Sequence, residues 1–279
     1  MHYMKLCYNQ ATTMRNSTLE QDLLYCEQYG YDYIEIRIDQ LKDYLTRNTL
    51  EDLAAFFQTS RLKPFAFNGL EEFNYRSEEA FQSILDDTAL CCAASDLLNC
   101  KMLTMDPQFN VGHLTVPQIR EDTVKTIREI LSYTDPHGMK LAFEFCGAPA
   151  CCINTYGQAY DIVKAVDSPN FGIILDFFHF YAMGSKIEDL RTSDADKIFM
   201  VHIDDVEDYP LGQATDADRV WPGDGVIYLD EIMQTLLAIG YDGVYSLELF
   251  RPAYWEIPAE DVIRIGKEKS MAFLKKYYK

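Results

Sequence analysis

Short runs of apolar residues recur along the chain and are separated by longer segments of helical character. Most of the runs are nearly continuous rather than alternating, which is typical of parallel strands that are covered on both faces. Each run therefore predicts one buried strand. The eight runs are "MKLCYN" (4–9), "YDYIEIR" (31–37), "KPFAFN" (63–68), "KMLTMD" (101–106), "KLAFEF" (140–145), "FGIILDFF" (171–178), "IFMVHIDD" (198–205) and "VYSLELF" (244–250).

The segments between these runs carry apolar residues at the spacing of amphipathic helices. Leu19, Leu23 and Leu24 mark the buried face of the first predicted helix. Ser17 with Glu20 predicts a capping box at its start. Other segments with clear helical spacing lie near residues 81–89, 119–131 and 232–239.

Strands that alternate with helices predict parallel βα units. Eight such units in about 250 residues match the size of a (β/α)8 (TIM) barrel, an α/β fold. A doubly wound open sheet is the alternative. No linker or low-complexity segment interrupts the pattern, so we expect residues 1–279 to form a single TIM-barrel domain.

The charge balance excludes some partners. The chain has 25 basic and 44 acidic residues, a net charge of −19 with neutral histidines. Non-specific nucleic-acid binding depends on Lys and Arg that displace counterions, so no nucleic-acid partner is expected. An anionic membrane surface is disfavoured for the same reason. The charge alone identifies no substrate.

The N-terminal stretch "MHYMKLCYN" runs directly into a strand-like pattern and lacks the layout of a signal peptide. No segment approaches the roughly 18 uninterrupted apolar residues of a membrane span. We therefore expect a cytoplasmic protein without a membrane partner. The eight cysteines form no CxxC pair, so reduced and mostly buried thiols are expected rather than a disulfide framework.

The apolar run "FGIILDFFHFYAMG" (171–184) contains Asp176, and a buried carboxylate is costly unless it is paired or bound to a metal. Three more polar residues occupy similar places in neighbouring predicted strands: Glu144, His202 and Glu248. In a TIM barrel the carboxyl ends of the strands form the active site, so these four side chains can converge.

Three carboxylates and one imidazole in one place would repel each other without a cation. This oxygen-rich set with a single histidine suits Mn²⁺, Co²⁺, Fe²⁺ or Zn²⁺. The alternative is that each residue is paired independently in the core. Asp204 and Asp205 are candidates either for hydrogen-bond partners of the metal-binding His202 or for solvated residues.

These residues, together with several longer motifs, resemble a known superfamily. The motifs are "LDFFHFYAMGS", "HIDDVEDYP", "DRVWPGDG" and "ELFRP". In them the chain resembles the xylose isomerase-like superfamily of metal-dependent TIM barrels, which includes sugar isomerases, epimerases and endonuclease IV. The likeness covers most of the chain. It implies one divalent metal ion (Mn, Co, Fe or Zn) held by Glu144, Asp176, His202 and Glu248.

The resemblance also implies a reaction. The motifs are most similar to those of enzymes that isomerise a keto-cyclitol such as 2-keto-myo-inositol, an inosose of inositol catabolism, so such a cyclitol or a related ketose is the expected substrate. The ion would polarise the carbonyl, and Glu144 and Glu248 would move a proton through an enediolate, with either one as the abstracting base. By similarity, His179 and Arg219 contact substrate oxygens. Trp221 is a candidate wall of the sugar pocket or ordinary hydrophobic cover.

Other activities of the superfamily are the alternatives. Ketose 3-epimerases carry a further glutamate where this chain has Ala150, and endonuclease IV relatives carry extra histidines where it has Asn68, Asp106 and Val220. A ketose 3-epimerase or an inosose dehydratase is therefore the second choice, and a nuclease is less favoured. A purely sugar-binding protein has no need of clustered carboxylates. A homo-oligomer is compatible with the sequence.

Overall fold

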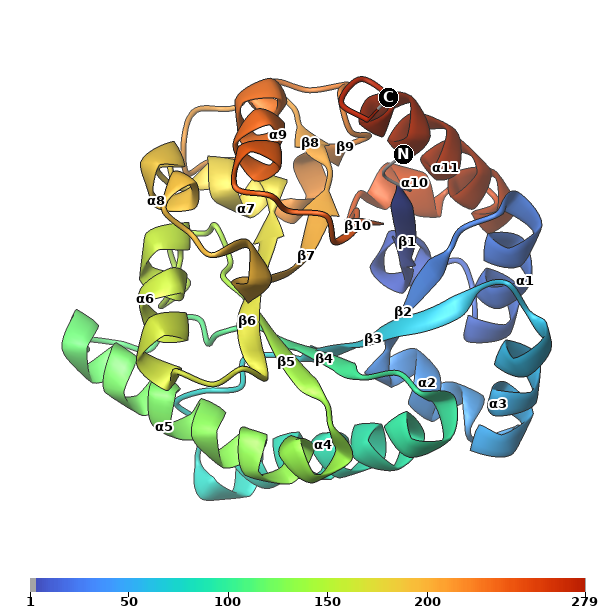
Figure 1. Ribbon diagram of the computed structural model, residues 1–279, viewed down its shortest axis with the longest axis horizontal. Coiled ribbons are helices and arrows are strands. Elements are labelled where there is room, and N and C mark those ends of the chain that lie inside the picture. Colours follow the sequence, from blue (N-terminus) through green and yellow to red (C-terminus); the bar gives the residue numbers. More distant parts are fainter. Residues whose placement is uncertain (1–3, 279) are drawn as a thin grey trace.

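Eight parallel strands close into a barrel in the computed structural model, which describes residues 4–278 (Figure 1). The barrel strands are β1 (Lys5–Asn9), β2 (Tyr33–Arg37), β3 (Lys63–Leu70), β4 (Met102–Met105), β5 (Lys140–Glu144), β6 (Phe171–Asp176), β7 (Ile198–Ile203) and β10 (Val244–Leu247). Their order around the barrel is β1-β10-β7-β6-β5-β4-β3-β2. Closure is made by β1 and β10, where Lys5 pairs with Val244 and Tyr8 with Leu247. The predicted TIM barrel is confirmed, and the open sheet is excluded.

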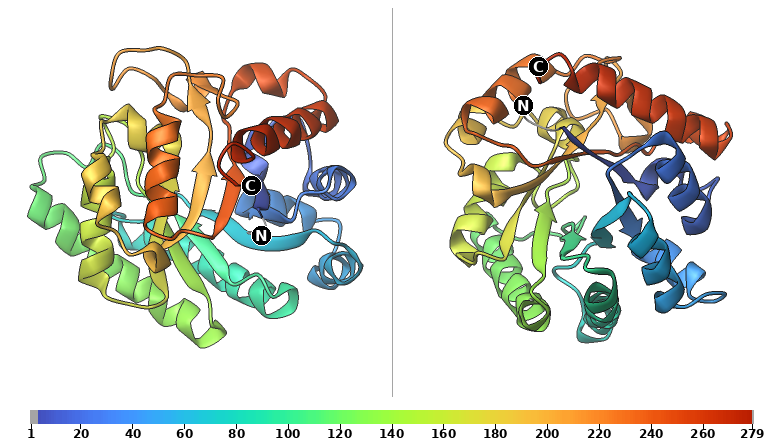
Figure 2. Two further views of the ribbon diagram at one scale, coloured as in Figure 1. Left: turned by 45° about the horizontal axis from the view of Figure 1, so that its top comes forward. Right: turned by 45° about the vertical axis from the view of Figure 1, so that its right-hand side comes forward.

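Helices surround the barrel, and most of them form an outer ring (Figures 1 and 2). They are α1 (Leu19–Tyr29), α2 (Ile38–Tyr44), α3 (Leu50–Thr59), α4 (Glu78–Leu98), α5 (Val116–Thr134), α6 (Tyr156–Val166), α7 (Phe177–Ala182), α8 (Ile187–Arg191), α9 (Leu229–Ala238), α10 (Pro252–Trp255) and α11 (Ala259–Leu274). Within residues 4–278, none of them combines the length and apolar character that crossing a membrane requires.

The first helix begins one residue later than its predicted capping box implies. The Thr18 hydroxyl accepts a hydrogen bond from the Gln21 backbone N–H, and the Gln21 side chain accepts one from Thr18 N–H. The predicted box of Ser17 and Glu20 is therefore wrong by one position. Leu24 was expected on the buried face, but 62% of it is exposed. The buried face of α1 instead includes Leu19 and Leu23.

Three strands end two or more residues earlier than the apolar runs predict. Strand β6 stops at Asp176, because its side chain accepts a hydrogen bond from His179 N–H (2.6 Å) and so caps α7. Strand β7 stops at Ile203, where the chain enters a small antiparallel hairpin of β8 (Asp205–Val206) and β9 (Arg219–Val220). Strand β10 stops at Leu247, which leaves Glu248 directly beyond the strand end.

The barrel lumen contains a small apolar cluster of strand residues. Their neighbours in the strands, such as Phe143, Leu175 and Val201, belong to the larger core that packs under the helices. The side-chain period of two in a strand produces this separation into inner and outer faces. The lumen cluster consists of Ala66, Met102, Ala142, Ile174, Phe199 and Met200. Phe199 and Met200 are consecutive members, at the place where the register between β6 and β7 shifts.

Candidate metal centre

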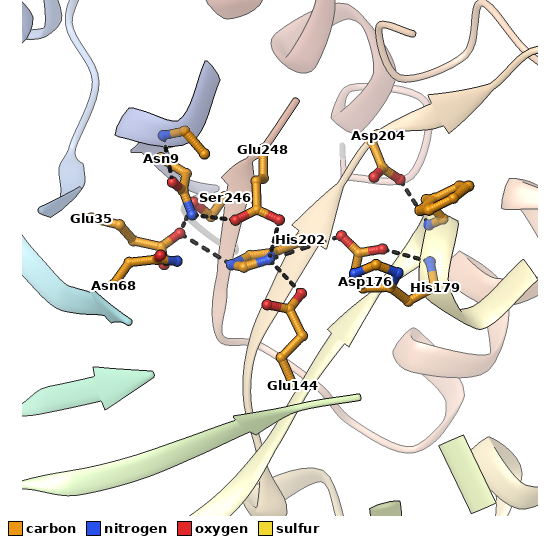
Figure 3. Close-up of polar contacts among 12 residues, drawn as sticks. Asn9, Glu35, Asn68, Glu144, Asp176, His179, His202, Asp204, Ser246 and Glu248 are labelled. Atoms are coloured by element: carbon orange, nitrogen blue, oxygen red, sulfur yellow. Dashed lines mark hydrogen bonds and ion pairs between the residues drawn. The ribbon is translucent and has the colours of Figure 1, made fainter. Parts of the chain in front are cut away.

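Four side chains converge at the carboxyl ends of consecutive barrel strands: Glu144 from β5, Asp176 from β6, His202 from β7 and Glu248 after β10 (Figure 3). Each offers one ligand atom, and these atoms lie within 4.8 Å of one another. All four residues are buried. The residues that were predicted to bind the ion are therefore brought together.

The strand pattern explains why these side chains share one face. Glu144, Asp176 and His202 each lie two residues beyond a member of the lumen cluster, so they point into the barrel as well. Strands β6 and β7 place Asp176 beside His202, and β10 places Ser246 beside His202. The lumen thus changes from apolar to polar within two residues.

The imidazole of His202 is oriented with Nδ1 toward the carboxylates. This nitrogen lies 2.9 Å from Glu144 Oε1 and 3.1 Å from Glu248 Oε2. Asp176 Oδ2 is 3.9 Å from it. Burial works against a charged imidazole, but the neighbouring glutamates outweigh burial and raise the pKa of His202 well above its usual value. The cluster therefore favours a positive charge at its centre.

The two glutamates of the cluster have different surroundings. Burial raises the pKa of Glu144, and His202 only partly opposes this shift. Burial also acts on Glu248, but His202 and Arg219 outweigh it and lower the pKa of that carboxyl. Asn9 Nδ2 also donates a hydrogen bond to Glu248 Oε1 (2.7 Å). Glu248 is thus held charged by more partners than Glu144.

Arg219 is completely buried and binds carboxylates of this region. The β8–β9 hairpin returns it to the barrel, where Nη1 lies 2.8 Å from both Asp176 Oδ2 and Asp204 Oδ2. The same nitrogen is 3.2 Å from Glu248 Oε2. The guanidinium also lies over the Phe178 ring, 4.8 Å from its centroid. Arg219 therefore offsets the negative charge of the cluster.

A cavity of about 390 Å³ opens beside the cluster, a volume suited to a small molecule. Glu144 and Glu248 line it, whereas Asp176, His202 and Arg219 do not. The two predicted catalytic carboxylates are thus the members of the cluster that reach the cavity. Other lining residues include Arg37, Asn68, Glu71, Glu72, Asp106, Phe178, His179 and Phe250.

His179 lies in the wall of this cavity and is fixed from two sides. Its Nδ1 accepts a hydrogen bond from Gly147 N–H (3.0 Å), and its Nε2 lies 3.0 Å from Arg219 Nη2. Burial lowers the pKa of His179 despite the nearby Asp176. A neutral imidazole is therefore presented to the cavity, where His179 was expected to meet substrate.

Two expected substrate contacts do not reach the cavity. Arg219 lies behind His179 and faces the carboxylates. Trp221 is 7% exposed, and its ring stacks on Tyr254 with centroids 4.3 Å apart. The expectation that Trp221 walls the sugar pocket is corrected, because the β8–β9 hairpin turns the ring into the core. Aromatic cover of the cavity comes instead from Phe109, Phe178 and Phe250.

Asp204 and Asp205 are buried, but neither contacts His202. Asp204 accepts a hydrogen bond from Phe178 N–H (2.9 Å) and pairs with Arg219. Asp205 accepts hydrogen bonds from the backbone N–H groups of Gly225 and Ile227, in the loop that follows the hairpin. Both alternatives for these residues are therefore wrong, because neither is a direct partner of His202 and neither is solvated.

Sequence reasoning missed Glu35, which is completely buried in β2. Its Oε1 lies 3.2 Å from His202 Nε2, on the side of the ring away from Glu144 and Asp176 (Figure 3). The available indication was a single acidic residue between two isoleucines, in "YIEIR" (33–37). Asp106 was also missed as a cavity residue, and burial raises its pKa to about 8.

A closed parallel barrel with carboxylates and an imidazole gathered at its carboxyl end defines a class of metal-dependent barrel enzymes. The chain belongs to the xylose isomerase-like TIM barrel family, whose sequence model matches residues 23–277.

Individual relatives are similar over the whole length. The chain is 45% identical to inosose isomerase of Halalkalibacterium halodurans over 276 residues, which cover 99% of this chain and 98% of that protein. It is 44% identical to inosose isomerase of Bacillus subtilis, with 99% of both chains covered. It also superposes on a crystal structure of the IOLI protein with a bound zinc atom, with a TM-score of 0.96, 44% identity and 99% of both chains covered.

Proposed function

We propose that this protein is a metal-dependent isomerase that moves the carbonyl group of a keto-cyclitol, an inosose, or of a related ketose to the adjacent carbon. The observation that carries this proposal is the position of Glu144 and Glu248, which belong to the four-residue cluster and also line the cavity. Two carboxylates on one small-molecule cavity suit proton removal and return. The inosose isomerases at 44–45% identity support the cyclitol as substrate and a role in inositol catabolism.

The donor set fits a divalent ion. Three carboxylates and one imidazole nitrogen lie close enough together to bind one cation, and the carboxylates would otherwise repel each other. Glu144, Asp176, His202 and Glu248 would hold the ion, with Mn²⁺, Co²⁺, Fe²⁺ and Zn²⁺ as the candidates. When bound, it would act as a Lewis acid on the ketone and its neighbouring hydroxyl.

The chain's own residues divide the remaining work. Glu144 and Glu248 hold the proton that moves between adjacent carbons, and a positioned base of this kind contributes about 10²–10⁴-fold in rate. His179 contacts a substrate oxygen from the cavity wall. Arg219 forms ion pairs with Asp176 and Glu248 from behind the cluster. Phe178 covers part of the cavity with an apolar face and limits the access of water.

The test is NMR of the metal-loaded protein in D₂O with a panel of inososes and ketohexoses. An isomerase yields a new ketone isomer with deuterium incorporated at the reacting carbon. An epimerised ketohexose as the main product, or an unsaturated product formed by loss of water, would contradict the proposal in favour of the epimerase or the dehydratase. Chelator-stripped protein, which should be inactive until Mn²⁺ or Co²⁺ is added, is the control.

A further inference from the structure

We propose that Glu35 is a positioning residue for the metal centre: it holds the ring of His202 so that Nδ1 faces the three carboxylates. Glu35 does not line the cavity and is not one of the four residues whose ligand atoms gather, so it acts on the site through His202. It lies behind the histidine, on the opposite side of the ring from Glu144 and Asp176 (Figure 3). The inference rests on the metal site of the proposed function but not on the identity of the substrate.

The first step is the chemistry of the imidazole. A histidine that binds a metal through one ring nitrogen carries a proton on the other, and this N–H needs an acceptor. Both ring nitrogens of His202 face glutamates, but Nδ1 faces the metal-binding cluster, because Glu248 Oε2 lies 3.1 Å and Asp176 Oδ2 3.9 Å from it. Nδ1 is 2.9 Å from Glu144 Oε1, and Nε2 is 3.2 Å from Glu35 Oε1. The arrangement therefore assigns the proton to Nε2 and the metal-binding lone pair to Nδ1.

The second step is burial. His202 and Glu35 are both completely inaccessible, so water is a poor substitute for the carboxylate. The Nε2 contact with Glu35 is an ion pair, and Nε2 has no hydrogen-bond partner among residues 4–278. Without Glu35, this buried N–H would lose the carboxylate that lies 3.2 Å away, which is unfavourable where water is excluded. The His202 ring would then become more stable by turning, or by moving its proton to the other ring nitrogen.

The third step is the rigidity of Glu35 itself. Its strand pairs with β1 on one side and β3 on the other, with Asn9 and Ala66 as its partners in register. The Ser246 hydroxyl donates a hydrogen bond to Oε1, and Asn68 Nδ2 donates one to Oε2 (3.4 Å). These contacts come from three different strands. A carboxylate fixed in this way can orient a neighbouring ring.

A buried carboxylate could instead have a purely structural role, and the chain offers a matched comparison. Asp22 is 1% exposed and accepts hydrogen bonds from Gln10 Nε2 (2.8 Å) and Thr13 Oγ1 (3.0 Å). It resembles Glu35 in burial and in its neutral donors. Unlike Glu35, Asp22 makes no contact with His202 in the structure. Loss of Asp22 therefore reports the effect of removing a buried carboxylate without disturbing the histidine.

The experiment measures Zn²⁺ affinity by competition with a chromophoric chelator in Glu35→Ala, Glu35→Gln and Asp22→Ala, without substrate. Loss of the partner of a metal-binding histidine commonly weakens affinity about 10–100-fold, and this is expected for Glu35→Ala. Glu35→Gln keeps an acceptor oxygen and should recover most of the loss. Asp22→Ala should keep the wild-type affinity. A folded Glu35→Ala with wild-type affinity would overturn the proposal.

A second readout does not depend on Glu35→Ala being folded. Long-range ¹H–¹⁵N NMR of the zinc-loaded wild type should show His202 protonated at Nε2. In Glu35→Gln the acceptor changes from a carboxylate to an amide, so the Nε2–H resonance should move. An unchanged resonance would mean that Glu35 does not accept this proton. Because no substrate is present, a failure of the proposed isomerase activity would leave both results interpretable.

Discussion

Two regions of the barrel lumen lie two residues apart on the same strands and have opposite character. One is the apolar lumen cluster, and the other is the metal-binding cluster at the carboxyl end. The pairs are Ala142 and Glu144 on β5, Ile174 and Asp176 on β6, and Met200 and His202 on β7. Within one strand, therefore, the inward position nearer the carboxyl end supplies the chemistry and the one before it supplies packing.

The two clusters make opposite contributions to the stability of the fold. Apolar side chains in the lumen gain about 25 cal/mol per Å² of surface removed from water. The buried carboxylates two residues further on lose hydration, and Arg219 and His202 only partly offset their charge. If this division is correct, changes in one cluster should affect stability and changes in the other should affect metal binding and chemistry.

The largest effect is expected from Glu248→Gln. Glutamine keeps the size and a carbonyl oxygen, but it cannot accept a proton from carbon. We expect substrate C–H exchange in D₂O to fall about 10²–10⁴-fold, with the free energy of unfolding changed far less. The measurement is deuterium incorporation by NMR at saturating metal, because Glu248 is also a proposed ligand.

Glu144→Gln is the matched variant, since both glutamates line the cavity. It should lose a comparable factor if the two carboxylates share the transfer. Exchange at the wild-type rate in metal-saturated Glu248→Gln would reduce Glu248 to a ligand. His179, which faces the same cavity, would then be the next candidate for the base.

Met200→Ala tests the apolar cluster. Met200 is completely buried and lies two residues before His202, on the same lumen face of β7. A methionine-to-alanine change in a core costs about 2–5 kcal/mol of stability. We expect this loss in chemical denaturation, with Zn²⁺ affinity close to wild type. A large loss of affinity at preserved stability would show that the two clusters are not separate.

Much of the fold could be predicted because each barrel strand is an apolar run. The strand ends could not be predicted as well. The sequence "DFFHFYA" (176–182) remains apolar after Asp176, so nothing in its hydrophobicity marks the change from β6 to α7. The change depends on the Asp176 carboxylate, which caps the helix at His179 N–H. A side chain predicted only as a ligand thus also ends its strand.

The four clustered residues could be predicted because each one is polar within an apolar strand near its carboxyl end. Glu35 fits the same description, but its contact with His202 depends on barrel closure, which brings β2 and β7 to one lumen. The position of Trp221 was predicted wrongly for a different reason. Its position follows from the β8–β9 hairpin, whose two-residue strands leave no periodic pattern in the sequence.

Buried carboxylates with and without a neighbouring cation should titrate differently. Arg219 and His202 lower the pKa of Glu248, whereas Asp22 has only neutral donors and burial raises its pKa to about 6. The folded state therefore binds the Asp22 proton more tightly than the unfolded state does. The protonated form of Asp22 stabilises the fold fully below about pH 4. About 3 kcal/mol of this stability is lost as the pH rises to about 6.

Asp22→Asn removes this titration, so the measurement is the difference in unfolding free energy between wild type and Asp22→Asn from pH 4 to pH 7. Relative to Asp22→Asn, the wild type should lose about 3 kcal/mol of unfolding free energy as the pH rises from about 4 to about 6. Above about pH 6 the difference should stay constant. Both proteins are measured with chelator, so that metal release does not contribute. Parallel pH profiles for the two proteins would rule out a raised pKa at Asp22.

The smallest expected effect lies outside the lumen, at the start of α1. The Thr18 hydroxyl accepts the Gln21 N–H and so satisfies one of the free donors at the helix start. Thr18→Ala should lower the free energy of unfolding by about 1 kcal/mol, whereas Thr18→Ser keeps the hydroxyl and should retain most of it. Equal stabilities of the two variants would contradict a capping role for Thr18. Because α1 packs on the outside of the barrel, neither variant should change Zn²⁺ affinity or deuterium exchange, and a change in either would mean that the clusters in the lumen respond to the outer ring.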